Sequence, residues 1–255
     1  MKNFQLVLNK EHWVVGRFSA LASLPGVVHA VTTRESPLFD SRADSEQTQR
    51  AVHHLTAALG FTEIAWCHQV HGDAVFAVTA GGLVGEADAL LTDTRQLGLL
   101  GRSADCPLIL VAGPLETTTP AWAVGMAHAS WRSTIAGIAG RLITKLVHRY
   151  HVAPERVVAG ICPSAGPCCY EVGEEIRTAA ISAFGPEAQD HFTTRAGKLY
   201  FDLWSANKDQ LSRAGLLFDH IHVAGYCTLC HNDRFPSYRR EGAAAPRFAA
   251  VIGWF

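Results

Sequence analysis

The chain has 255 residues, of which 48% are hydrophobic and 18% are charged, and its formal net charge is -1. A chain of this length can bury a substantial core, in one large domain or two small ones. Near-neutral charge without a basic run argues against a surface that binds nucleic-acid phosphates, so we expect a small-molecule or peptide ligand.

The N-terminal stretch MKNFQLVLNKEHW lacks a long apolar core and a small-residue cleavage site, and no run of about eighteen apolar residues occurs. A cytoplasmic protein without membrane contact is therefore expected. The seven cysteines are an odd number in a chain with no export signal. They are expected to remain thiols or metal ligands and not to form a disulfide framework.

The first predicted elements are a strand over residues 27–34 and a helix over residues 44–60. Asp44 or Ser45 is expected to cap the start of this helix, because a side-chain oxygen there can accept from a free backbone N–H. Gly60 is expected to end it.

The next apolar runs, residues 64–66 and 75–78, are predicted to be paired strands with a turn at residues 71–73. A strand-rich region follows, in which glycine, proline or polar residues separate the apolar runs. These predicted strands cover residues 87–93, 97–103, 107–113 and 122–128.

A long helix is predicted over residues 131–150, with Ser130 as its N-cap. Its apolar residues recur every three or four positions: Trp131, Ile135, Ile138, Leu142, Leu146 and Tyr150. The remaining predicted elements are a strand at 156–162, helices at 173–185 and 202–215, and strands at 220–227 and 247–255. Because these elements do not alternate regularly, we expect one α+β domain over residues 1–255, with mixed β-sheets flanked by helices.

The stretch WCHQVHGD, residues 66–73, places a cysteine, two histidines and an aspartate within a few positions. Successive side chains of a strand point to opposite faces, so His68 and Val70 share one face while Cys67, Gln69 and His71 share the other. The two histidines are therefore expected to diverge. The turn places His71 at the end of a sheet, where a site could open.

Two more candidate ligands also stand at the ends of apolar strands. Asp105 and Cys106 lie where one strand ends and Pro107 opens the next, and His128 ends a strand just before a helix. Three neighbouring strands would bring His71, Cys106 and His128 together. Three N and S ligands with an open fourth position are typical of a catalytic zinc site.

The predicted helix start beside His128 offers a place for an anion. The backbone N–H groups after Ser130 and the positive end of the helix dipole favour negative charge, and Arg132 in the first turn would strengthen the site. A surface salt bridge is the alternative role of Arg132. A second arginine candidate is the pair Arg239 and Arg240, which suits a phosphate or a base ring; a solvated charge run is the alternative.

Two cysteine clusters remain. CTLCH, residues 227–231, matches the pattern of c-type haem attachment, but haem is normally attached outside the cytoplasm, so haem is not expected. Half of a structural zinc site is the alternative, yet CPSAGPCC, residues 162–169, has the wrong spacing for a clean second half. We expect its thiols to be buried along a loop.

Taken in order, the motifs QVHGD, EADALLTD, ADCPLIL, AHASWR, GPCCYEVG and SYRREG resemble the YfiH-like laccase-domain family over most of the chain. The resemblance implies an α+β fold and metal ligands at His71, Cys106 and His128. It implies a zinc-dependent purine nucleoside phosphorylase acting on adenosine, inosine and methylthioadenosine, with adenosine deaminase as a side activity. Phosphate or ribose contacts are assigned to Arg132 and Ser130, with Arg34 and Arg240 as outer candidates.

Three alternatives stay open. A cysteine hydrolase that edits peptidoglycan precursors would use Cys106 as thiolate with His71 or His128 as base. A polyphenol oxidase, which older descriptions of the family imply, would need copper and many more histidine ligands. A binding protein without turnover is the third, because Ser130 and Ser133 stand where the family carries glycine. Nucleoside and phosphate are the expected partners, and monomer and dimer are both compatible with the sequence.

Overall fold

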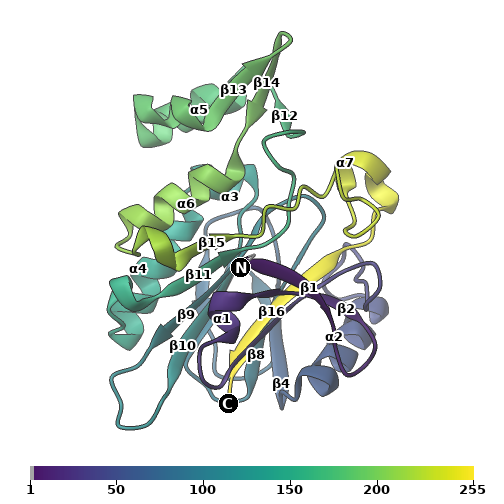
Figure 1. Ribbon diagram of the computed structural model, residues 1–255, viewed down its shortest axis with the longest axis vertical. Coiled ribbons are helices and arrows are strands. Elements are labelled where there is room, and N and C mark those ends of the chain that lie inside the picture. Colours follow the sequence, from purple (N-terminus) through teal and green to yellow (C-terminus); the bar gives the residue numbers. More distant parts are fainter. Residues whose placement is uncertain (1–2) are drawn as a thin grey trace.

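The computed structural model describes residues 3–255 and contains three β-sheets with helices around them, the α+β architecture expected (Figure 1). The larger two sheets pack face to face. The seven-stranded sheet has the order β1 (Phe4–Leu8), β2 (Val14–Phe18), β3 (Val27–Thr32), β16 (Phe248–Trp254), β8 (Leu97–Ser103), β4 (Glu63–His68), β6 (Gly82–Glu86). The six-stranded sheet has the order β15 (Ile221–Val223), β11 (Val158–Ile161), β9 (Leu108–Pro114), β10 (Trp122–His128), β7 (Ala89–Thr92), β5 (Val75–Ala77).

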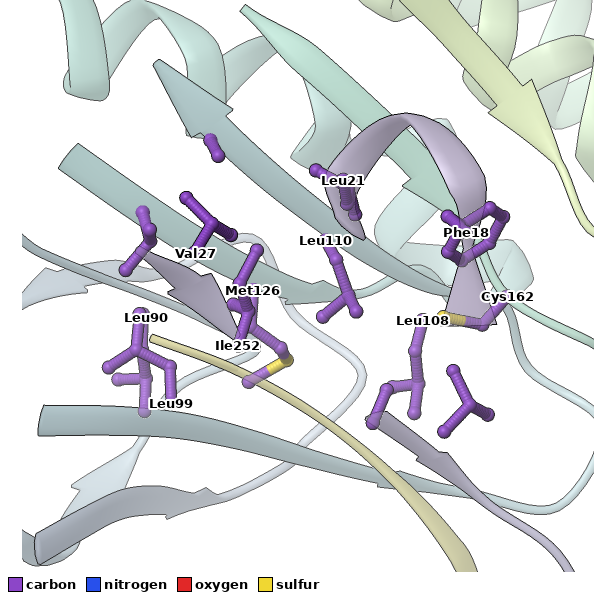
Figure 2. Close-up of a cluster of buried hydrophobic side chains, with 14 of the residues drawn as sticks. Phe18, Leu21, Val27, Leu90, Leu99, Leu108, Leu110, Met126, Cys162 and Ile252 are labelled. Carbon is purple, nitrogen blue, oxygen red and sulfur yellow. The ribbon is translucent and has the colours of Figure 1, made fainter. Parts of the chain in front are cut away.

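The core between the two sheets is made by alternate residues of strands that are buried on both faces. In β8, Leu99 points into this inner core, whereas Leu100 packs in a separate outer cluster. In β9, Leu110 lies in the inner core and Val111 in a second outer cluster. Figure 2 shows side chains of both sheets meeting there with Phe18 and Leu21. Burial on both faces explains why these strands are nearly continuous apolar runs.

Helices cover the two outer faces, which gives four layers (Figure 1). The helix α2 (Glu46–Leu59) packs Val52 and Leu55 against the seven-stranded sheet. The helices α4 (Ile138–Tyr150) and α6 (Leu203–Arg213) cover the six-stranded sheet. The shorter helices are α1 (Ser19–Ala22), α3 (Trp131–Ile135) and α7 (Tyr238–Glu241). Within residues 3–255, no helix is long and apolar enough to cross a membrane.

A small third sheet projects from one end of the molecule together with α5 (Glu174–Phe184) (Figure 1). It consists of β12 (Glu171–Val172), β14 (Lys198–Phe201) and β13 (Phe192–Arg195). The tight turn between β13 and β14 has positive φ at Ala196 and Gly197. The sequence patterns did not predict this sheet, nor the strands β1, β2 and β6.

The caps of α2 confirm one prediction in detail. Ser45 is the N-cap, its Oγ accepting from Thr48 N at 3.1 Å, and Gly60 ends the helix at φ 78°. The single long helix predicted over residues 131–150 is wrong, because Gly137 at φ 82° separates α3 from α4. The break sends Trp131 and Ile135 to a cluster beside α5, while Ile138 and Leu142 pack on the six-stranded sheet.

The predicted pairing of residues 64–66 with 75–78 is also wrong. The strand β4 lies between β8 and β6 in one sheet, whereas β5 is the edge strand of the other. The segment between them crosses from one sheet to the other and carries His71. A local turn signal cannot distinguish a hairpin from such a crossing, because both need a sharp change of direction.

Candidate active site

The ends of β8 and β10 and the crossing segment between β4 and β5 meet at one edge of the sandwich and bring His71, Cys106 and His128 together. One ligand atom from each residue lies within 4.8 Å of those of the other two. Cys106 lies between β8 and β9, and His128 is the last residue of β10. The convergence expected from the sequence is therefore present. His68 is not part of this group; it lines a different cavity from the one lined by His71.

His71 reaches the group from a constrained backbone conformation. Its φ is 61°, a left-handed value that is uncommon for a residue other than glycine. Three successive N–H groups, those of Val70, His71 and Gly72, donate to the carboxylate of Asp88 at 3.2, 3.1 and 2.7 Å. These hydrogen bonds hold the crossing segment in place and offset the cost of the unusual conformation.

Asp88 also orients His128. Its Oδ1 lies 2.7 Å from His128 Nδ1, and both side chains are buried. A carboxylate on Nδ1 leaves Nε2 of the ring free to face Cys106, as in the carboxylate–histidine–metal arrangement. The sequence analysis missed Asp88, although a carboxylate at the start of the buried run ADALLT was a usable signal.

The electrostatics of the trio favour an ionised sulfur. Burial by itself would raise the pKa of the Cys106 thiol, but the nearby positive charge of His128 and hydrogen bonds from His128 and His71 outweigh burial and lower that pKa to about 7. Burial would lower the pKa of His128, but Cys106 and Asp88 raise it to about 9. Burial opposes ionisation of Asp88 too, yet its bonds with His128 and backbone amides lower its pKa.

Asp105, next to Cys106, is held from two other parts of the chain. Its φ is 95°, and its two carboxylate oxygens accept from Thr228 Oγ1 at 2.6 Å and from Arg239 N at 2.7 Å. Its own carbonyl accepts from Ala165 N at 2.7 Å. The two bonds of its carboxylate tie the Cys106 turn to residues more than a hundred positions away in the sequence.

The trio lies at one side of a cavity of about 380 Å³. The cavity is lined by Ser41, Gln69, His71, Arg102, Ser103, Ala104, Asp105, Cys106, His128, Tyr170, Leu203, Tyr238, Arg239 and Arg247. Three of these residues are arginines and two are tyrosines. A volume of this size suits a small molecule with polar and aromatic parts.

Two arginines of the wall, Arg102 and Arg247, repel each other and leave room for an anion's charge to stabilise them. Arg102 is buried, donates from one guanidinium nitrogen to Asp40 O at 3.0 Å, and has no partner for Nε among residues 3–255. Burial and the neighbouring positive charge of Arg247 both lower the pKa of Arg102. An anion between these guanidinium groups would relieve their repulsion. The sequence did not single out Arg102 or Arg247, because each lies in an apolar strand or loop without a motif of its own.

Arg239, one of the pair considered in the sequence, lines this wall. The other arginines expected from the sequence lie outside it. Arg34 pairs with Glu241 at 2.5 Å and also donates to Asn232 O at 2.6 Å. Arg132 is exposed, with its guanidinium 4.3 Å from the centre of the Trp131 ring. Arg240 is exposed on α7, where its N–H donates to Ser237 Oγ at 3.3 Å.

Ser130 has a well-defined structural role. Its Oγ accepts from Ser133 N at 3.1 Å and lies 2.8 Å from Ser133 Oγ, as expected of an N-cap. The helix that it caps, α3, has five residues. The backbone start of α3 is therefore positioned by the side chains of two serines.

The exposure of two cysteines in the segment CPSAGPCC differs from the prediction. Cys162 is buried, but Cys168 is exposed and Cys169 is half-buried, so the prediction that all three line a loop as buried thiols is wrong for the last two. They lie beside Cys227 and Cys230 of the CTLCH segment. The spacing in the sequence gave no sign of this, because the two segments come together only through the sheet order.

The fold and the trio define an α+β protein with a candidate catalytic metal centre at one side of an arginine-rich cavity. The chain belongs to the multi-copper polyphenol oxidoreductase laccase family, whose model matches residues 32–255.

Relatives named as purine nucleoside phosphorylases match most of the chain. It is 34% identical over 227 residues to the purine nucleoside phosphorylase YlmD of Geobacillus stearothermophilus, covering 84% of this chain and 80% of the relative. It is 34% identical over 241 residues to a purine nucleoside phosphorylase of Deinococcus radiodurans, covering 89% of each. The crystal structure of YlmD superposes with a TM-score of 0.84 at 29% identity, over 100% of this chain and 99% of that one.

Proposed function

We propose that this protein is a zinc-dependent purine nucleoside phosphorylase. The observation that carries the proposal is the combination, in one cavity, of the His71–Cys106–His128 trio with three arginines and two tyrosines. Phosphorolysis needs an anion pocket that positions phosphate beside the ribose, and a second pocket that holds the purine. The reaction class, phosphorolysis of purine nucleosides, is taken from the relatives, which are named purine nucleoside phosphorylases.

The donor atoms of the trio fit zinc. Zinc bonds of about 2.0–2.1 Å to nitrogen and 2.3 Å to sulfur put tetrahedral ligands roughly 3.3–3.8 Å apart, and the three donors already lie within 4.8 Å of one another. His71, Cys106 and His128 would hold the ion, with Asp88 behind His128. Bound zinc supplies Lewis-acid chemistry toward an oxygen or a water in the cavity.

We assign phosphate binding to Arg102, Arg239 and Arg247. A phosphate anion there would give Arg102 Nε a partner and screen the repulsion between Arg102 and Arg247. Arg132 and Ser130 remain proposed contacts at the α3 start. Arg34 and Arg240 remain proposed outer contacts.

The purine is assigned to the tyrosine side of the cavity. Tyr170 and Tyr238 offer aromatic faces for stacking, and Arg239 lies 5.3 Å above the Tyr170 ring. Burial, followed by the negative charges of Cys106 and Asp105, raises the pKa of Tyr170. Its hydroxyl therefore stays protonated near neutral pH and can donate a hydrogen bond to a nitrogen of the departing purine.

The substrates proposed are adenosine, inosine and methylthioadenosine, with deamination of adenosine as a side activity. Each nucleoside would be incubated with the protein with and without phosphate, and the free base, ribose 1-phosphate and inosine would be followed by mass spectrometry. Release of base that depends on phosphate supports the proposal. Zinc-loaded protein that releases no base from any of the three would refute it.

Two alternatives have specific support. A cysteine hydrolase is favoured by the position of Cys106 between two histidines, and it would keep its activity after the metal is removed. Phenol oxidation is favoured by the family's description. However, the other metal-type cluster among residues 3–255 consists of four cysteines and adds none of the histidines that multicopper chemistry needs. Oxidation of a phenol by copper-loaded protein is the test.

A further inference from the structure

A second cluster of side chains that can bind a metal ion lies beside the cavity. Cys168 and Cys169 come from the segment after β11, and Cys227 and Cys230 come from the segment after β15. One sulfur from each lies within 4.8 Å of the other three. Cys230 Sγ is 3.6 Å from Cys168 Sγ and 3.4 Å from Cys169 Sγ.

These separations match a tetrahedral metal site. Four sulfurs at about 2.3 Å from a zinc ion lie roughly 3.8 Å from one another. A disulfide bond requires about 2.05 Å, and it can join only two of the four thiols. Without a bound ion, two exposed thiols, those of Cys168 and Cys230, would face each other at the surface.

The backbone around Cys227 is organised to hold a sulfur ligand. Gly166 N donates to Cys227 Sγ at 3.3 Å, as backbone amides do for metal-bound thiolates. The approach is close, because a Cβ on Gly166 would lie 3.1 Å from Cys227 Cβ and 2.7 Å from the Trp204 ring. A β-bridge between Ser164 and Cys227 joins the two segments.

We propose that Cys168, Cys169, Cys227 and Cys230 bind one structural zinc ion. Four sulfur donors leave no open position, which is the arrangement of a structural zinc site and not of a catalytic one. Cys227 and Cys230 have the Cys-x-x-Cys spacing common in such sites. The proposal concerns an ion other than the one assigned to His71, Cys106 and His128, so it does not depend on the proposed reaction.

The ion would brace one wall of the cavity. Tyr170 directly follows Cys169, and Thr228, which directly follows Cys227, donates to Asp105 at 2.6 Å. Zinc would therefore link the segment that carries Tyr170 to the segment that holds the turn before Cys106. Loss of the ion is expected to loosen both segments and to lower the unfolding temperature.

The primary test uses intact protein purified without chelator. Elemental analysis should find two zinc ions per wild-type chain and one in Cys106→Ala. X-ray absorption of zinc in Cys106→Ala should show sulfur alone as ligand, at about 2.3 Å. This measurement needs no change in the cluster, so it does not depend on whether cluster variants fold.

Cluster variants supply the complementary test. The double variant Cys168→Ser and Cys230→Ser should lose one zinc ion per chain and keep the other. Cys162→Ala, a buried cysteine outside the cluster, is the matched control and should keep both. The proposal is overturned by nitrogen or oxygen ligands in Cys106→Ala, by iron in place of zinc, or by metal-free protein in which mass spectrometry finds a cluster disulfide or four free thiols.

Discussion

Asp88 and His128 are joined twice. The carboxylate of Asp88 lies 2.7 Å from His128 Nδ1, and His128 N donates to the carbonyl of Asp88 at 2.7 Å. The first contact sets which ring nitrogen faces the cavity, and the second fixes the end of β10 beside the start of β7. A single buried aspartate therefore places one proposed metal ligand directly and a second, His71, through the amides of the crossing segment.

Asp88→Asn should weaken zinc binding at the trio by about ten- to a hundredfold, because an amide holds the His128 ring less strongly and makes it a poorer ligand. Zinc affinity at the trio would be measured by competition with a chromophoric chelator. Zinc bound by the cysteine cluster would be determined separately. Asp93→Asn makes the same chemical change at an exposed position after β7 and should have no effect. Equal affinity in the Asp88 and Asp93 variants would show that Asp88 does not support the metal site.

Arg102→Ala should reduce phosphorolysis by about ten- to a hundredfold, the effect of losing a charge-assisted hydrogen bond of about 1.5–3 kcal/mol. Arg102→Lys should restore only part of this, because a point charge cannot replace the guanidinium fork. The affinity for nucleoside, measured by calorimetry without phosphate, is the control and should change little. A loss confined to nucleoside affinity would move Arg102 to the purine or ribose.

Arg132→Ala should cause a smaller loss that is also selective for phosphorolysis, since Arg132 lies outside the cavity wall. Phosphorolysis and deamination of adenosine would be compared on the same zinc-loaded protein. Only phosphorolysis uses phosphate as nucleophile, so general unfolding or metal loss would lower both activities together. An equal loss of both with zinc retained would contradict the phosphate role of Arg132.

His29 should make stability depend on pH. Burial, with a smaller contribution from the charge of Arg17, lowers the pKa of His29 from 6.5 to about 3, and its Nε2 accepts from Phe18 N at 2.8 Å. Between these two pKa values, His29 is protonated in the unfolded chain but neutral in the folded chain. The free energy of unfolding therefore decreases as the pH falls from 6.5 toward 3. Between pH 7 and pH 5 the free energy of unfolding should fall by about 2 kcal/mol through this residue.

The contribution of His29 can be isolated with His29→Gln, which keeps an acceptor for Phe18 N but does not titrate. Urea unfolding at pH 7 and pH 5 would be compared in the two proteins, and other titrating groups cancel in the difference. The wild type should lose about 2 kcal/mol more than the variant over this interval. Parallel pH profiles would mean that His29 is not the group responsible.

Gly137→Ala and Gly140→Ala should change stability in opposite directions. Gly137 has φ 82° and open space around its Cα, so an added methyl group is opposed by the backbone conformation and should destabilise by about 1–2 kcal/mol. Gly140 lies inside α4, where a Cβ meets Gln210 O only at 4.0 Å, and alanine there should stabilise by up to about 1 kcal/mol. Urea unfolding of both variants would measure the two effects, and changes of the same sign would contradict the left-handed break.

Local patterns predicted much of the fold because they report properties of short segments. The caps at Ser45 and Gly60 follow from the needs of a single helix, and the apolar runs follow from burial on both faces of a strand. The positions of Cys106 and His128 at strand ends were likewise visible in the sequence. The α+β architecture was predicted from the order of these elements together with the resemblance to the family.

The sheet order decided the rest, because it determines which distant segments touch. It placed β4 and β5 in different sheets, put Asp88 behind His128, and gathered Arg102 and Arg247 around one cavity. Cys168 and Cys230 are 62 positions apart, yet their sulfurs lie 3.6 Å from each other. Residue spacing along a chain carries no information about such contacts, which depend on how whole strands pair and how the two sheets pack.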